Sequence, residues 1–194
     1  MPPRYYPESE LQRLVDKIQF LPVDLNIHRS KLTDLLEEYA EWLAKEASEH
    51  FKIDYFAVGE TSIREYIAST IDRLLSDVSS RHIYYLVELE GSAIGMGALH
   101  QVRENVAEIK RMYIRPAYRG KGYGKALLQQ LLQKVKEYGC HTIHLESARF
   151  MTAAQNLYRS FGFVERNEYP ETEIPPQLRP IWLFMEKTLE NTTK

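Results

Sequence analysis

Cysteine is almost absent from this chain of 194 residues, which contains only Cys140. A single cysteine excludes an internal disulfide bond and a zinc site built from cysteines. The histidines do not replace such a site, because His141 and His144 lie three positions apart on a predicted strand and so face opposite sides of it. We therefore expect no bound metal, and we interpret Cys140 as a small buried residue rather than a nucleophile.

Long apolar runs and an excess of charge of either sign are absent as well. No apolar stretch approaches the roughly 18 residues of a membrane-spanning helix, and the opening MPPRYYPESE lacks the basic and then apolar pattern of a secretion signal. The 25 basic and 27 acidic residues nearly balance, which argues against nucleic acid or a membrane surface as the main partner. These absences favour a cytoplasmic globular protein.

Positive charge is nevertheless concentrated in one stretch. Residues 110–136 include eight Lys or Arg side chains and no Asp or Glu. Lys134 and Lys136 complement the C-terminal end of a predicted helix, but cations near a helix N-terminus are unfavourable unless an anion lies among them. The basic residues that this leaves unexplained, and that indicate a bound anion, are Arg111, Arg115, Arg119, Lys121 and Lys125.

Alternating glycines at Gly120, Gly122 and Gly124 lie within this stretch and permit a sharp turn and a close approach of the backbone to a ligand. A helix is predicted to follow, because apolar residues recur at helical spacing at Leu127, Leu128, Leu131, Leu132 and Val135. The first N–H groups of a helix bind phosphate readily. The spacing matches neither G-x-x-x-x-G-K-[ST] nor G-x-G-x-x-G, so we predict a phosphate-bearing cofactor bound by a different loop.

Two motifs in this region carry a family resemblance. Residues 119–124, RGKGYG, match R-x-x-G-x-G, and residues 154–163, AQNLYRSFGF, match A-x-x-x-Y-x-x-x-G-F. Together, and in this order, they resemble the two signatures of the GNAT superfamily of acetyl-CoA-dependent N-acetyltransferases. The resemblance covers roughly residues 83–189.

The resemblance implies a single N-acetyltransferase domain over residues 1–194, of class α/β. It implies a mixed, mostly antiparallel sheet whose central parallel strand pair splays around the cofactor, with helices on both faces. Residues 1–80 would form a helical region on the acceptor side, and residues 82–189 the cofactor-binding core. A homodimer is expected from family habit.

Hydrophobic periodicity and turn residues predict the individual elements. Predicted helices cover residues 11–20, 30–47 (capped by Ser30), 62–77 (opened by a capping box from Ser62 to Glu65), 122–138 and 153–161. Predicted strands lie within 20–27 and over 82–90, 93–102, 106–114, 141–146, 163–169 and 181–189.

The resemblance also implies cofactor contacts. The backbone of Met112, Tyr113 and Ile114 would pair with pantetheine like an added strand, and the N–H of Ile114 would polarise the thioester carbonyl. Asn156 would contact the pantetheine or phosphate arm. The residues expected around the pyrophosphate are Arg119, Gly120, Lys121, Gly122, Tyr123, Gly124 and Lys125.

Acetyl transfer to an amine benefits from a general base, and the candidate is Glu108. It lies six residues before Ile114, where family members with a catalytic glutamate carry it, and burial could raise its pKa. Two alternatives remain open: a water molecule takes the proton, or Glu108 is an edge-strand residue paired with Lys110 or Arg111. In an unbroken strand Glu108, Lys110, Met112 and Ile114 would share one face, although a bulge would break that phase.

The candidate general acid is Tyr158, at the fifth position of the second motif, because a phenol stays protonated at neutral pH and can donate to a departing thiolate. The predicted activity is transfer of acetyl from acetyl-CoA to a primary amine of a small molecule or protein, by direct attack in a ternary complex. The alternative is a non-catalytic acetyl-CoA sensor. The loop over residues 169–180 should help to shape the acceptor pocket, where Glu168, Glu171 and Glu173 could favour a cationic amine.

Overall fold

The computed structural model describes residues 17–76 and 81–189. Its strands form one seven-stranded sheet in the order β1-β2-β3-β4-β5-β7-β6. β4 and β5 are parallel, and all other neighbours in the sheet are antiparallel. The predicted α/β class, with a mixed and mostly antiparallel sheet and one parallel pair, is confirmed.

The elements follow one another in a simple order along the chain. The strands are β1 (Ile18–Pro22), β2 (His82–Leu89), β3 (Ser92–Arg103), β4 (Val106–Ile114), β5 (Thr142–Ala148), β6 (Val164–Arg166) and β7 (Trp182–Thr188). The helices are α2 (Leu25–Phe51), α3 (Tyr55–Val58), α4 (Ile63–Ser76), α5 (Tyr123–Glu137) and α6 (Thr152–Ser160), with 3₁₀ turns η1 (Pro116–Tyr118) and η2 (Arg179–Ile181). Within the described ranges, none of these helices combines the length and apolarity needed to cross a bilayer.

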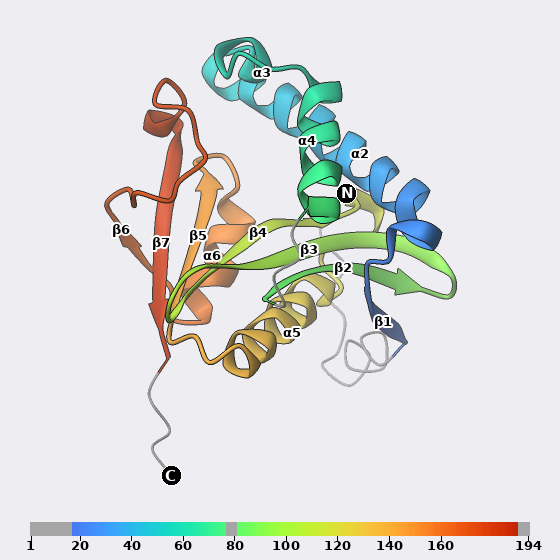
Figure 1. Ribbon diagram of the computed structural model, residues 1–194. Coiled ribbons are helices and arrows are strands. Elements are labelled where there is room, and N and C mark those ends of the chain that lie inside the picture. The colour runs from blue at the N-terminus through green and yellow to red at the C-terminus, as the bar shows by residue number, and fades with distance from the viewer. Residues whose placement is uncertain (1–16, 77–80, 190–194) are drawn as a thin grey trace.

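Helices cover both faces of the sheet (Figure 1). α2 and α4 pack on one face, where the core includes Leu32, Leu36 and Tyr113. α5 and α6 pack on the other, and the leucine stripe predicted for α5 is buried there with Tyr158 and Phe163. The sheet is therefore the middle layer of three. A ligand bound in an opening of the sheet can contact residues on both faces.

The parallel pair is held together over only part of its length. β4 pairs with β5 from Val106 to Ile109, opposite Thr142 to Leu145, and beyond this point the two strands diverge (Figure 1). A bulge lies where the divergence begins, because Arg111 has a φ of 53° and the register with β3 shifts there. Bulges bend a strand and increase its twist, so this one opens the centre of the sheet.

The bulge also breaks the alternation of β4. Lys110 lines a cavity on the α2 and α4 face together with Tyr39, whereas Met112 and Ile114 pack against the core of the α5 and α6 face. The shared face that an unbroken strand would give to Glu108, Lys110, Met112 and Ile114 is therefore absent, as expected in the case of a bulge. The extra residue inserted at Arg111 is the reason.

The remaining differences from the predicted elements concern element boundaries and the short helix α3, which was not predicted. α2 begins at Leu25 rather than near Ser30, because the Asp24 carboxylate accepts a hydrogen bond from the Asn26 N–H at 2.9 Å and caps the helix there. Residues 18–20, predicted as the end of a helix, belong to β1, and residues 11–16 lie outside the described residues. β6 covers only 164–166 of the predicted 163–169, because it is an edge strand that pairs with β7 alone.

The capping box at the start of α4 is confirmed. The Glu65 N–H donates to the Ser62 hydroxyl at 3.2 Å, and the Ser62 N–H donates to the Glu65 carboxylate at 2.8 Å. Two N–H groups that the helix leaves unpaired are satisfied in this way. The division of the chain into residues 1–80 on the acceptor side and 82–189 as a cofactor-binding core stays a prediction.

Gly95 in β3 is expected to be intolerant of even one methyl group. A Cβ there would lie 2.5 Å from the Tyr113 carbonyl oxygen and 2.5 Å from Ile114 Cδ1, so the Gly95→Ala variant must displace the backbone of β4. We expect it to lose about 1–3 kcal/mol in the free energy of unfolding, the usual cost of overpacking, measured by urea denaturation. The matched control is Gly97→Ala, whose Cβ would first meet the side-chain tips of Leu127 and Leu131 at 3.1–3.3 Å, which can move without the backbone. Equal losses for the two variants would contradict this explanation.

Candidate active site

The loop that leads into α5 has the conformation of an anion site. Gly120 and Gly122 have φ values of 76° and 83°, which glycine adopts without strain. Gly122 is the N-cap of α5, and the first turn of that helix contains no acidic residue. Arg119 and Lys125 are exposed and Lys121 is half-buried beside it. A helix N-terminus flanked by cations in this way attracts phosphate.

Fewer basic residues remain for a bound anion than the five that the sequence predicts. Arg111 donates through Nε to the Tyr66 hydroxyl at 2.9 Å, and Arg115 lies 2.6 Å from the Glu38 carboxylate. Contacts within the protein therefore account for these two arginines. Arg119, Lys121 and Lys125 remain at the loop as its basic residues.

Arg119 connects this loop to both β4 and α2. Its Nε donates to the Ile114 carbonyl at 2.9 Å. Its guanidinium carbon lies 4.9 Å from the ring centroid of Trp42 and 5.5 Å from that of Tyr113, within the range of cation–π attraction. The loop is therefore fixed against the strand predicted to bind pantetheine.

The three segments predicted to bind the cofactor meet in space. A Cβ at Gly124 would lie 3.8 Å from Leu157 Cδ2 in α6 and 4.0 Å from Ile114 Cγ1 in β4. The Tyr158 hydroxyl lies 3.9 Å from the Met112 sulfur. Residues 112–114, residues 119–125 and the part of α6 that carries Asn156 and Tyr158 thus surround one place. They do so beside the opening between β4 and β5.

Tyr158 is buried, with 7% of its surface exposed, and this burial raises its pKa to about 12. The phenol is therefore fully protonated at neutral pH. It also lies close enough to the Tyr39 hydroxyl for the two to interact electrostatically. Tyr39 lines a cavity on the other face of β4, so Tyr158 interacts electrostatically with a residue of that cavity.

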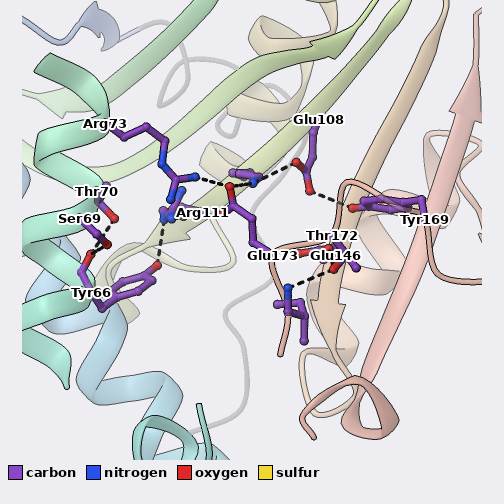
Figure 2. Close-up of polar contacts among 12 residues, drawn as sticks. Tyr66, Ser69, Thr70, Arg73, Glu108, Arg111, Glu146, Tyr169, Thr172 and Glu173 are labelled. Carbon is purple, nitrogen blue, oxygen red and sulfur yellow. Dashed lines mark hydrogen bonds and ion pairs between the residues drawn. The ribbon is translucent and has the colours of Figure 1, made fainter. Parts of the chain in front are cut away.

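The cavity has a volume of about 380 Å³ and lies among α2, α3, α4, the bulged part of β4 and the loop before β7. Its size is that of a small-molecule site. Aromatic walls are provided by Tyr39, Tyr55, Phe56, Tyr66 and Trp182. The charged side chains in its lining are Arg73, Lys110, Arg111, Glu146 and Glu173. Figure 2 shows several of these charged groups with the contacts that join them.

Glu108 lies at the back of this site and is fully buried. Its carboxylate contacts Lys110 Nζ at 3.0 Å and accepts a hydrogen bond from the Tyr169 hydroxyl at 2.9 Å (Figure 2). Burial raises the pKa of Glu108, while Lys110 and Tyr169 oppose the rise. The pairing with Lys110 considered from the sequence is present, but the edge position is not, because β4 is the central strand of the sheet.

Glu146 in β5 is the acidic residue that the sequence reasoning missed. It lines the cavity itself, and its carboxylate accepts a hydrogen bond from the Thr172 hydroxyl. Burial, and after it the negative charge of Glu108, raises the pKa of Glu146 to about 7. The only signal in the sequence was a glutamate inside a predicted strand, and it was weak because Thr142, His144 and Ser147 are polar residues of β5 as well.

The acidic loop residues do not form a cation-binding surface. Glu168 pairs with Arg179 at 3.1 Å and Glu171 with Arg103 at 2.6 Å. Glu173 contacts Arg73, Lys110 and Arg111. The suggestion that these carboxylates favour a cationic amine is therefore not supported. Within residues 17–76 and 81–189, no group of His, Cys, Asp and Glu is suited to hold a metal ion.

Comparison with known proteins decides the family. The model of the Acetyltransferase (GNAT) family matches residues 36–163, which is more than half of the chain. The chain belongs to the acetyltransferase (GNAT) family. The resemblance seen in the two motifs is confirmed.

Individual relatives agree with this assignment. The uncharacterized N-acetyltransferase YjgM of Escherichia coli is 34% identical over 85 residues, which cover 42% of this chain and 51% of that protein. The [ribosomal protein bS18]-alanine N-acetyltransferase of E. coli is 30% identical over 102 residues, 50% of this chain and 68% of that one. The chain thus spans about half the length of YjgM.

A solved structure confirms the GNAT fold. The PaiA N-acetyltransferase of Thermoplasma acidophilum, in complex with coenzyme A, has a TM-score of 0.65 at 20% identity, covering 89% of this chain and 99% of that chain. The family match ends at residue 163. The loop that carries Tyr169, Thr172 and the cavity residue Glu173 therefore lies outside the matched part of the chain.

Proposed function

We propose that this GNAT protein transfers the acetyl group of acetyl-CoA to a primary amine by direct attack in a ternary complex. The observation that carries the proposal is the meeting of the loop before α5, the bulged part of β4 and α6 beside a charged cavity. The relative that is named for acetylating an alanine of a ribosomal protein, and the neighbour solved with coenzyme A, support it. A homodimer and a cytoplasmic location stay predictions.

The cofactor would bind along the segments that meet. The pyrophosphate would lie on the N–H groups of residues 119–125, with Lys121 and Lys125 nearby. Pantetheine would pair with the edge of β4 at Met112, Tyr113 and Ile114, which the divergence of β5 leaves without a neighbouring strand in the described sheet. Asn156, exposed on α6, would contact the same arm.

The reaction needs one proton acceptor and one stabiliser of the leaving group. The amine nitrogen attacks the thioester carbonyl carbon, the new C–N bond forms, the C–S bond breaks, and the amine proton passes to a base. Tyr158 would donate a hydrogen bond to the departing sulfur. Its pKa of about 12 exceeds the ordinary value of about 8.5 for a thiol. The phenol would therefore stabilise the thiolate by hydrogen bonding without losing its proton.

Two carboxylates compete for the role of base. Glu108, the candidate from sequence, is fully buried and held by Lys110 and Tyr169. Glu146 borders the space where an amine can enter and has a pKa of about 7, and a base is most effective when its pKa lies near the working pH. We propose Glu146 as the group that accepts the proton, with burial and then the charge of Glu108 keeping the pKa of Glu146 high. Proton transfer through water, or to Glu108, is the alternative that the variants below distinguish.

The proposal is tested by acetyl-CoA binding and by release of CoA thiol in the presence of a panel of primary amines. Acetyl-CoA should raise the melting temperature, since it binds only the folded state, and some amines should cause CoA release. In the double variant Lys121→Glu, Lys125→Glu the KM for acetyl-CoA should rise about 10–100-fold, because charge-assisted contacts to phosphate are lost.

The matched control is Lys136→Glu, an exposed residue at the other end of α5, which should leave that KM nearly unchanged. A protein that binds acetyl-CoA but releases no CoA with any amine would be a sensor and not an enzyme. A protein whose melting temperature does not respond to millimolar acetyl-CoA would contradict the proposed cofactor site.

A further inference from the structure

The cavity contains more positive charge than an amine substrate needs. Arg73 comes from α4, and Lys110 and Arg111 come from β4, so its lining includes three cations. Lys110 and Arg111 expose only 13% and 12% of their side chains. Two carboxylates, Glu146 and Glu173, line the same cavity, so the cations outnumber the anions of the lining and can bind an anionic part of a ligand.

One loop residue, Glu173, touches all three of these cations. Its carboxylate is paired with Arg73, lies 2.9 Å from Lys110 Nζ and lies 4.0 Å from an Arg111 guanidinium nitrogen (Figure 2). Burial acts to raise the pKa of Glu173, but Lys110 and then the two arginines outweigh it and hold the pKa below its ordinary value. The three cations therefore form a site that binds a carboxylate, and in this structure the bound carboxylate is that of Glu173.

The occupant of this site is suited to being exchanged. The Glu173 side chain is 45% exposed, and it belongs to the segment between β6 and β7, in which η2 is the only described regular element. The contact of Glu173 with Arg111, at 4.0 Å, is longer than a hydrogen bond. A small carboxylate that enters the cavity could make shorter, bidentate contacts with the guanidinium groups.

The amine of the same ligand would lie near Glu146. Thr172, the neighbour of Glu173, donates to Glu146, the proposed base. Glu146 and the three cations line one cavity of about 380 Å³, so the carboxylate site and the base lie within reach of one small molecule. The aromatic walls of the cavity would accept an apolar side chain.

We propose that the acceptor is an amino acid, whose carboxylate replaces Glu173 on Arg73, Lys110 and Arg111 while its amine faces Glu146. This inference rests on the proposed acetyl transfer and adds the substrate class. The loop residue Glu173 acts as an internal substitute for the substrate carboxylate. It offsets part of the positive charge of these cations when no substrate is bound.

The first experiment compares matched acceptors: L-phenylalanine, its C-terminal amide and phenethylamine, each with acetyl-CoA. The kcat/KM of the amino acid should exceed those of the other two by about 10–100-fold, the effect expected of a charge-assisted contact. The amide has the less basic amine, with an α-amino pKa of about 7.7–8.0, so chemistry alone would favour the amide. Equal or higher kcat/KM for the compounds without a carboxylate would overturn the inference and leave the proposed acetyl transfer standing. The comparison is repeated with alanine and methionine to cover side-chain size.

The second experiment changes the carboxylate site. Arg73→Gln should raise the KM for the amino acid about 10–100-fold and leave kcat/KM for phenethylamine within about twofold, whereas Glu173→Gln should lower the KM for the amino acid by removing its competitor. The control is Arg103→Gln, an exposed arginine that pairs with Glu171 of the same loop and does not line the cavity. An Arg73→Gln variant that loses activity on all three acceptors equally would indicate a structural role and contradict the proposal.

A third measurement does not depend on turnover. N-acetyl-L-phenylalanine should raise the melting temperature of the wild-type protein and of Arg103→Gln, but not of Arg73→Gln. Such a pattern supports the carboxylate site even if no amine is acetylated, in which case the proposed function alone has failed. A shift that is the same in wild type and Arg73→Gln contradicts the carboxylate site.

Discussion

Replacing Glu146 by glutamine is expected to lower kcat/KM at neutral pH by about 10²–10⁴-fold, the usual contribution of a general base. Glutamine keeps the shape of the side chain and an oxygen that accepts the Thr172 hydrogen bond, so the fold should be preserved. The loss would therefore report the missing proton acceptor. Steady-state kinetics with saturating acetyl-CoA measure it.

The pH dependence identifies the base more directly. A base acts only when it is deprotonated, and the pKa of Glu146 is raised from 4.5 to about 7 by burial and then by the charge of Glu108. Below pH 7 the wild-type kcat/KM should fall with a slope of about two per pH unit on a logarithmic scale, one from the amine and one from Glu146. In Glu146→Gln only the slope of the amine should remain.

Glu108→Gln is the matched control for this profile. It removes a negative charge that raises the pKa of Glu146, so the break in the profile should move to lower pH while most of the activity is kept. Disappearance of the break in Glu108→Gln, with Glu146→Gln unaffected, would show that Glu108 is the base. A break that persists in both variants would favour proton transfer through water.

Tyr158→Phe is expected to lower kcat by about 10²–10³-fold, the effect of removing one donor to a developing negative charge. The KM values should change little, because the hydroxyl stabilises the leaving sulfur only as the C–S bond breaks. The polar contact of this hydroxyl in the structure, with the Met112 sulfur at 3.9 Å, is weak. Its loss should cost less than about 1 kcal/mol of stability.

Tyr85, a second buried tyrosine, provides the control that distinguishes a role of Tyr158 in catalysis from a role in packing. Tyr85 lies in the same core as Tyr158, and its hydroxyl accepts a hydrogen bond from Gln130 at 3.3 Å. Tyr85→Phe should lower the melting temperature slightly and leave kcat unchanged. If Tyr158→Phe behaved in the same way, the assignment of Tyr158 to the leaving group would be wrong.

The sequence was most informative where local chemistry determines structure. The glycines at 120 and 122 and the leucines after them predicted the loop and α5, and Ser62 with Glu65 predicted the start of α4, because each depends on neighbours along the chain. The two family motifs predicted the segments that meet at the opening of the sheet. The place of Tyr158 in the second motif was enough to predict that it lies at this opening, where it is near Met112.

Features that depend on contacts between distant segments could not be predicted from the sequence. The bulge at Arg111 is a mismatch between β4 and β3, and no residue type in β4 marks it. The pKa of Glu146 depends on Glu108, a residue on another strand. The pairing of Glu173 with Arg73 joins residues a hundred positions apart, so the charge of the acceptor cavity became visible only in three dimensions.

The short pairing of β4 with β5 has a mechanical consequence. Backbone pairing between β4 and β5 covers four residue pairs, from Val106–Thr142 to Ile109–Leu145, and it joins the strands β1 to β4 to the strands β5 to β7. The contacts of Glu108 with Tyr169 and of Lys110 with Glu173 connect the same two parts of the protein. A pantetheine chain paired with β4 beyond Ile109 would continue the backbone hydrogen bonding past the point where β5 leaves, so the bound cofactor would make the centre of the sheet more rigid before the acceptor arrives.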